Sequence, residues 1–225
     1  MKKIALVAAL AGLFAAGSAN ALIIDDFDTV QYTDIRTTGA PASLHTNAAT
    51  TGGMVSPDRD VTVNITAGAS GFANVADADA DSGHMTFSTG PTIAMSVDIL
   101  WDGFASTDLT DGGLSTGIYV LLPTPNDHDL IISFNVNGST LTKTVVSGST
   151  GAAFFFDFAS FSNPAIFTGV TSIDMTVTGT NPATAWDANI DLVETVPHPP
   201  TVPEPATLGL LGLGLLGLGA MRRKA

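Results

Sequence analysis

This sequence contains no cysteine, and it is poor in positive charge. The absence of cysteine excludes disulfides, thiolate zinc sites and thiol nucleophiles. Eight lysines and arginines oppose 21 acidic residues, which gives a formal net charge of −13 at pH 7. A surface of this sign repels the phosphates of nucleic acids and the headgroups of anionic lipids. We therefore expect no nucleic acid among the partners.

The central segment, Leu22 to Val196, is also poor in glutamate. It has nineteen aspartates and a single glutamate, Glu194, and only three basic residues, which are Arg36, Arg59 and Lys143. Abundant Asp, Thr, Ser, Gly and Asn disfavour helix interiors and suit strand ends and turns. Its 175 residues are enough for one domain with a substantial core and too few for two.

Short runs of alternating apolar residues dominate this segment. The clearest lies within 92–101, where one face of a strand would carry Ile93, Met95, Val97, Ile99 and Trp101. The dipeptide Asn137-Gly138 predicts a hairpin. Further strands are expected at 22–27, 61–66, 117–122, 130–136, 140–146, 152–158, 173–177 and 186–192, with most of 28–60 in loops. These strands, without an amphipathic helix, predict an all-β fold: a single antiparallel β-sandwich of jelly-roll type over residues 22–194.

The first 21 residues have the pattern of a secretory signal peptide. Lys2 and Lys3 form a positive start, residues 4–16 are apolar, and Ala19-Asn20-Ala21 is a small-x-small cleavage site. We expect signal peptidase to cut after Ala21, so that the mature chain begins at Leu22. A retained N-terminal anchor is the alternative, although the apolar run is short for a membrane span.

The last 31 residues have a different composition again. A Pro-rich linker at 195–202 precedes the triplet Pro203, Glu204 and Pro205, and an uncharged segment at 206–221 precedes Arg222, Arg223 and Lys224. As a helix, 206–221 would span roughly 24 Å, against roughly 30 Å of bilayer hydrocarbon. It is therefore predicted to be a short transmembrane helix whose basic end stays in the cytoplasm. A permanent C-terminal anchor is the alternative.

This tail, VPEPATLGLLGLG followed by Arg-Arg-Lys, resembles the PEP-CTERM sorting signal of Gram-negative bacteria. The resemblance implies that residues 203–225 are recognised by an exosortase, a membrane-bound cysteine transpeptidase, which cleaves near Pro203 to Pro205. It also implies export, transient anchoring in the inner membrane, and a final place on the cell surface or outside the cell. Exopolysaccharide and biofilm are the setting that the family resemblance suggests.

One acidic stretch is a candidate metal site. Asp77, Asp79 and Asp81 alternate with alanine before Ser82-Gly83, and alternating aspartates can direct several oxygens at one calcium ion. The stretch departs from an EF-hand loop because its glycine comes one place late and its twelfth residue is Ser88 rather than glutamate. A solvated acidic turn is the alternative, and we expect no other cofactor.

The remaining chemistry-bearing residues do not form a catalytic pattern. The four histidines lack metal-ligand spacing, and no G-x-S-x-G sequence occurs, so we predict that the protein is not an enzyme. Trp101 and Trp186 lie in phase with apolar alternation, which favours core positions over sugar-binding platforms. The aromatic run Phe154 to Phe158 is typical of a strand buried on both faces.

Two functions therefore remain open. The first is a non-catalytic surface or matrix protein that an exosortase processes and that is associated with exopolysaccharide. The second is a calcium-supported carbohydrate-binding module, with a glycan-active hydrolase less favoured. The second rests partly on the opening Ile24-Asp25-Asp26-Phe27-Asp28, which is similar to the start of some jelly-roll carbohydrate-binding modules.

Overall fold

The computed structural model describes residues 21–35, 43–50, 55–68, 76–149, 152–181 and 184–197. Ala19 of the predicted signal peptide lies outside these residues, and so does the whole predicted sorting signal: Pro203, Glu204, Pro205, the helix 206–221, Arg222, Arg223 and Lys224. Ala21 lies within them and is exposed. None of the helices within the described residues is both long and apolar enough to cross a membrane.

The described residues form fourteen strands and two short 3₁₀ helices, and all pairs of neighbouring strands are antiparallel. The elements are β1 (Ile23–Asp25), β2 (Gln31–Ile35), β3 (Ser43–Ala49), β4 (Asp58–Ala67), β5 (Ala76–Asp81), β6 (His84–Thr89), β7 (Ala94–Trp101), β8 (Gly117–Leu122), β9 (Leu130–Val136), β10 (Ser139–Val145), β11 (Ala152–Asp157), η1 (Phe158–Ser160), η2 (Pro164–Thr168), β12 (Ile173–Gly179), β13 (Ala188–Ile190) and β14 (Leu192–Val196).

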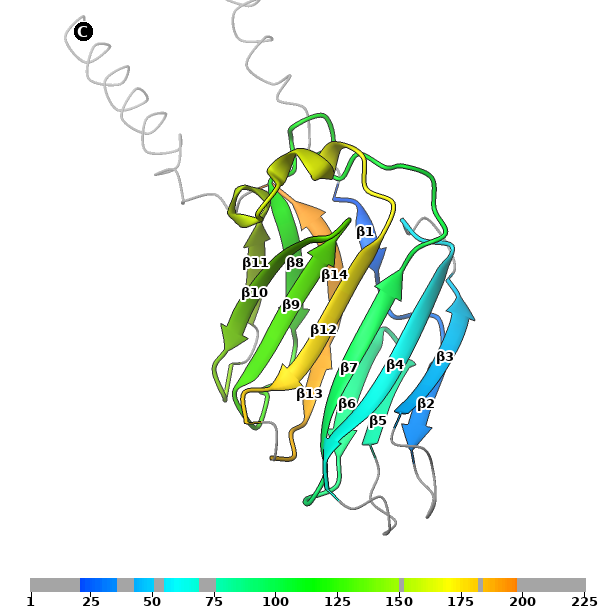
Figure 1. Ribbon diagram of the computed structural model, residues 1–225, viewed down its shortest axis with the longest axis vertical. Helices are drawn as coiled ribbons and strands as arrows, with labels where there is room; N and C mark the ends of the chain where they lie inside the picture. The colour runs from blue at the N-terminus through cyan, green and yellow to red at the C-terminus, as the bar shows by residue number, and fades with distance from the viewer. Residues whose placement is uncertain are drawn as a thin grey trace, which may run out of the picture.

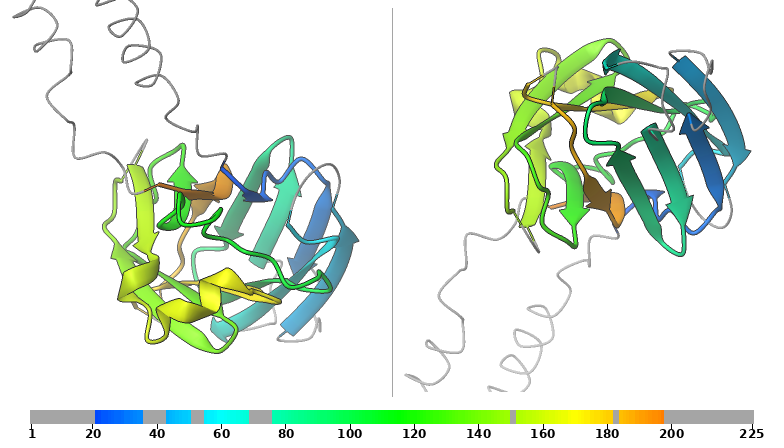
Figure 2. Two further views of the ribbon diagram at one scale, coloured as in Figure 1. Left: turned by 90° about the horizontal axis from the view of Figure 1, so that it is seen from above. Right: turned by 90° about the horizontal axis from the view of Figure 1, so that it is seen from below.

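These strands make two layers. One layer is a six-stranded sheet with the order β10-β9-β12-β7-β4-β3. The other layer consists of two four-stranded sheets, β1-β14-β8-β11 and β13-β6-β5-β2. Figure 1 looks onto the six-stranded sheet with the second layer behind it, and Figure 2 shows both layers from their ends. The predicted all-β fold, an antiparallel β-sandwich, is confirmed.

The core lies between the layers and follows from the alternation in the strands. In β7 the buried side chains recur at every second residue, and Trp101 is completely buried. Trp186 is only 1% exposed and packs against Phe87 with the ring centroids 5.7 Å apart. Its indole nitrogen donates a hydrogen bond to the carbonyl of Met95, at 3.0 Å. The prediction that both tryptophans are core residues is confirmed.

The prediction of loops over most of 28–60 is wrong for the residues of this stretch that the structure describes. Strands β2 and β3 lie in this stretch, and β3 pairs with β4 along its full length. The sequence of β3, SLHTNAA, has no strong apolar alternation, and its residues are only half-buried or exposed. It becomes a strand because β4 offers it a complete edge of hydrogen-bonding groups, and that edge exists only after folding.

The phenylalanine run is also less buried than its composition indicates. Phe156 is completely buried, whereas Phe154 and Phe155 are half-buried, and Phe158 begins the 3₁₀ helix η1. Phe155 lies on the outer face of its sheet, where its ring occupies the space beside Gly117: a Cβ there would come within 2.4 Å of the ring. The prediction of a strand buried on both faces is therefore wrong for the outer face.

The two ends of the described domain lie side by side. Ile23 of β1 is opposite Glu194 of β14. The amide of Thr195 donates to the carbonyl of Leu22 at 2.9 Å, and the amide of Leu22 donates to the hydroxyl of Thr195 at 3.2 Å. Strand β14 ends at Val196, two residues into the range predicted as linker, 195–202.

Candidate functional site

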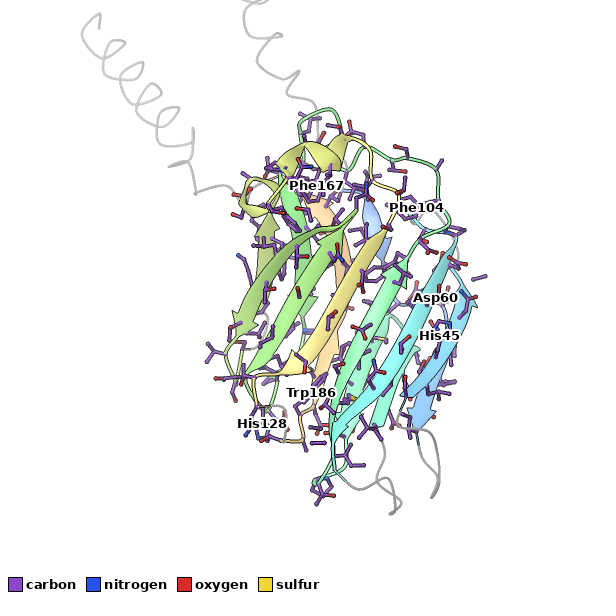
Figure 3. All side chains as sticks on the ribbon, viewed as in Figure 1. His45, Asp60, Phe104, His128, Phe167 and Trp186 are labelled. Carbon is purple, nitrogen blue, oxygen red and sulfur yellow. The ribbon has the colours of Figure 1, made fainter. Side chains whose placement is uncertain are left out.

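Several loops meet at one end of the sandwich and line a polar depression. They follow β6, β8, β10 and β12, and Figure 3 labels His128 and Trp186 among them. One pocket here has a volume of about 270 Å³, and a second, of about 630 Å³, shares Asp127, His128 and Thr184 with it. We call this region the loop-end pocket; its polar lining includes Asp127, His128, Asp129, Thr180, Thr184 and Asp187.

Hydrogen bonds from backbone amides to aspartate carboxylates connect the segments that line this pocket. Asp127 accepts a hydrogen bond from the amide of Asp187, at 2.7 Å. Asp187 in turn accepts one from the amide of Thr89, at 2.9 Å, and Asp129 accepts one from the amide of Ser147, at 2.7 Å. Each bond joins a side chain of one loop to the backbone of another loop or of the end of β6, so the lining is positioned before any ligand arrives.

The floor and the rim of the pocket have different chemistry. Trp186 forms part of the floor, and its backbone amide donates to the hydroxyl of Thr89, at 2.9 Å. A Cβ at Gly179 would come within 3.0 Å of the Trp186 ring, so a glycine keeps room for the indole. On the rim, Nδ1 of His128 lies 3.1 Å from a carboxylate oxygen of Asp127, and both side chains are nearly half exposed.

No lysine or arginine of the described chain lines this pocket. The two that the structure describes are engaged elsewhere. Arg59 is buried beside Asp25, and the Lys143 ammonium donates to the carbonyl of Phe155, at 2.6 Å. The pocket therefore offers mainly hydrogen-bond acceptors and hydroxyl groups.

The outer face of the six-stranded sheet is a second polar region. Asp98 in β7 accepts hydrogen bonds from Thr176 at 2.8 Å and from Asn64 at 3.0 Å. Toward the edge, His45 lies between Thr62, at 3.1 Å, and Asp60, at 3.3 Å (Figure 3). These contacts run across neighbouring strands on an open face, which is the pairing that stabilises a sheet.

Two carboxyl groups have raised pKa values, and they lie in different layers of the sandwich. Burial, and then the charge of Asp98, raises the pKa of Asp174 above its usual value. Burial also raises the pKa of Glu194, in β14. Asp174 lies near the start of β12, whereas Gly179, which lines the loop-end pocket, ends that strand. The two groups do not form the close carboxyl pair that glycoside hydrolysis requires.

The predicted calcium ligands lie on a strand rather than in a loop. Asp77 and Asp79 project from the same side of β5, and Asp34 of β2 is directly opposite Asp77. Oxygens of these three residues lie within 4.8 Å of one another, a spacing that could hold a metal ion. Asp81 is outside this group, and its carboxylate accepts hydrogen bonds from Ser82 and Tyr32.

Sequence reasoning missed Asp34. It lies in the stretch that we expected to be loop, more than 40 positions from Asp77. Only the pairing of β2 with β5 brings the two together. The residues of the loop-end pocket were missed for the same reason: they come from loops separated by whole strands, and none of them has a local motif.

The comparison with known families identifies the tail. An all-β domain followed by an uncharged segment and a basic end is the organisation of an exported protein with a C-terminal sorting signal. Residues 201–224 match the family model of the PEP-CTERM protein-sorting motif. The resemblance predicted from VPEPATLGLLGLG and Arg-Arg-Lys is confirmed. The match covers the tail and leaves the sandwich unassigned.

No curated protein matches this chain. Among solved structures, a family 11 carbohydrate-binding module from Clostridium thermocellum, in complex with a β-1,3-1,4-mixed-linked tetrasaccharide, is similar at 11% identity with a TM-score of 0.42. The match covers 80% of this chain and 98% of that module. A family 29 module from Piromyces equi is similar at 8% identity with a TM-score of 0.35, over 74% of this chain and 91% of that one. Likenesses this distant do not assign a ligand to this chain.

Proposed function

We propose that this chain is a non-catalytic surface or extracellular-matrix protein whose tail is processed by an exosortase. The observation that carries the proposal is the PEP-CTERM protein-sorting motif at residues 201–224. In this scheme, signal peptidase removes residues 1–21 during export. The segment 206–221 holds the precursor in the inner membrane until the exosortase cleaves near Pro203 to Pro205 and releases the domain to the cell surface.

The position of the domain ends supports this scheme. Cleavage after Ala21 leaves Leu22, whose backbone is bonded to Thr195 in β14. Cleavage near Pro203 falls beyond Val196, where the last strand ends. Neither cut removes a residue of the sandwich, so the released domain keeps its complete sheets.

A non-catalytic role fits the arrangement of the titratable groups. The three described histidines each pair with an aspartate on the surface, and the carboxyl groups with raised pKa values lie on different sheets. Catalytic sites concentrate such groups in one cleft. We therefore assign the domain a binding or structural role outside the cell.

The processing step has a direct test. Mass spectrometry of the protein released from the cell surface should give a chain that begins at Leu22 and ends near Pro203 to Pro205. A variant with Glu204→Ala should instead remain in the membrane fraction with Arg222 to Lys224 intact. The Pro200→Ala variant, changed in the same Pro-rich stretch, is the matched control and should be released normally. A released chain that still ends in Arg-Arg-Lys-Ala would refute the proposal.

A second function, carbohydrate binding, is favoured by the loop-end pocket. Its carboxylates and hydroxyls are the groups that bind sugar hydroxyls, and hydrogen bonds between the loops hold them in place. We propose that the pocket attaches the protein to exopolysaccharide in a biofilm. A glycan array probed with the protein, with and without calcium, tests this function. Absence of binding to every glycan would leave only the structural role.

A further inference from the structure

We infer that the loop-end pocket binds a sugar residue that carries a free ammonium group, in preference to acetylated or acidic sugars. The inference rests on the proposed carbohydrate-binding function and names the class of sugar. It depends on three features of the pocket: its unused carboxylate oxygens, its free hydroxyls and the size of the part that contains Asp129.

The carboxylates of the pocket have unused acceptor capacity. Asp129 and Asp187 each use one oxygen to accept a backbone amide, at 2.7 and 2.9 Å. Within the described chain, the second oxygen of each accepts no hydrogen bond. A carboxylate fixed in this way is a strong acceptor for a charged donor, because ion-assisted hydrogen bonds are shorter and stronger than neutral ones.

The charge of the pocket selects the sign of the ligand. Asp127, Asp129 and Asp187 lie around it, and none of the lining residues is a lysine or arginine in the part of the chain that the structure describes. His128 is already held by Asp127, at 3.1 Å. An ammonium group would offset this negative charge, whereas the carboxylate of a uronic acid would be repelled.

Hydroxyl groups and pocket size indicate a sugar rather than a simple amine. The hydroxyls of Thr180 and Thr184 make no hydrogen bond with the described residues, and both line the same pocket as Asp129. They can pair with ring hydroxyls, which polyamines and lysine side chains lack. The part of the pocket that Asp129, Thr180 and Thr184 line has a volume of about 270 Å³, which suits one sugar residue, and the adjoining part, which Asp187 lines, has a volume of about 630 Å³.

The test compares oligosaccharides of one length that carry an ammonium, an acetamido or a carboxylate group. The full chain, purified in mild detergent, is titrated by calorimetry at pH 6 with a glucosamine oligomer, its N-acetylated form and an oligogalacturonate. Spermidine serves as the amine without a sugar. We expect the glucosamine oligomer to bind at least about tenfold more tightly than the others, since hydrogen bonds to charged groups discriminate by this order.

Variants separate the pocket from the general acidity of the protein. Asp129→Asn and Asp187→Asn should each weaken glucosamine binding about tenfold. Asp60→Asn removes the same charge from the outer sheet face and should change binding less than about twofold. Unchanged thermal unfolding of the variants shows that the fold is intact, and either pocket variant suffices if the other unfolds.

Four outcomes would overturn the inference. Equal weakening by Asp60→Asn and Asp129→Asn would mean non-specific attraction, and equal binding of spermidine would mean that the sugar is irrelevant. Preferential binding of the N-acetylated oligomer or the uronate would contradict the ammonium preference while leaving the carbohydrate-binding function in place. Failure of all three oligosaccharides to bind would refute the inference, and the glycan array then decides separately whether the carbohydrate-binding function stands.

Discussion

The guanidinium of Arg59 lies 2.8 Å from each carboxylate oxygen of Asp25, and both side chains are completely buried. The carboxylate of Asp25 also accepts hydrogen bonds from the indole of Trp101, at 2.7 Å, and from the amide of Phe27, at 2.8 Å. The guanidinium of Arg59 also donates hydrogen bonds to the side-chain oxygen of Gln31, at 2.7 Å, and to the carbonyl of Thr29, at 2.7 Å. This network joins β1, β2, β4 and β7 across the two layers.

Breaking the Arg59–Asp25 pair should destabilise the domain strongly. Arg59→Met removes one partner and leaves the buried carboxylate without its counter-charge. We expect the free energy of unfolding, measured by urea denaturation, to fall by about 3–5 kcal/mol. The exposed pair His84–Asp191 is the control, and Asp191→Asn should cost less than about 1 kcal/mol. Equal losses in the two variants would contradict the role of burial.

Asp174 and Asp108 should affect the pH dependence of the free energy of unfolding in opposite directions. Burial and Asp98 raise the pKa of Asp174 above its usual 3.8. The stability that it contributes is therefore fully present below pH 3.8 and is lost as the pH rises through the folded-state pKa. Asp174→Asn should unfold at a higher urea concentration than the parent at pH 7, and the two should converge near pH 3.

The contribution of Asp108 to stability should depend on pH in the opposite direction. Hydrogen bonds from the hydroxyl and amide of Thr110 and from the amide of Gly112 lower its pKa below 3.8. Its contribution is present above pH 3.8 and is lost as the pH falls through the folded-state pKa. Asp108→Asn should be less stable than the parent at pH 7 and equal to it in strong acid. Parallel profiles for the two variants would contradict the assignment.

Calcium at millimolar concentration should raise the melting temperature of the protein. The predicted site contains Asp79, which the structure groups with Asp34 and Asp77. Asp79→Ala should therefore abolish the increase in melting temperature, and Asp34→Ala should do the same. Asp81→Ala is the matched control, because Asp81 lies outside the group. An unchanged melting temperature in the parent, or equal loss in all three variants at constant ionic strength, would refute the site.

The predicted mature start can be tested through stability. A chain that begins at Leu22 keeps the hydrogen bonds between Leu22 and Thr195 and the whole of β1. A chain that begins at Asp26 loses β1 and also the carboxylate that pairs with Arg59. We expect the shorter chain to unfold at a much lower urea concentration, or to fail to fold, whereas the Leu22 chain matches the parent. Equal stability would show that β1 is dispensable.

Much of the fold could be predicted from the sequence because its strands carry a local signal. In β7 and β12, apolar residues alternate with polar ones, and a two-residue period places them on one face whatever the partner strand is. The turn at Asn137-Gly138 is likewise local, and its two residues have positive φ angles of 46° and 86°. Strand β3 lacks such a signal, because its pairing with β4 rather than its composition defines it.

The candidate sites likewise divide into those with a local sequence signal and those that depend on the tertiary structure. The sorting tail is a contiguous motif whose charge and apolarity are set by composition, so the sequence by itself determined that the protein is exported with a PEP-CTERM signal. The sequence also determined the acidity and the absence of disulfides. Only the tertiary structure decided that Asp25 of the opening IDDFD is the buried partner of Arg59, that Asp34 joins Asp77 and Asp79, and that distant loops form the loop-end pocket. Those relationships depend on strand order and register, which arise when the two layers pack and are not written in any short segment of the chain.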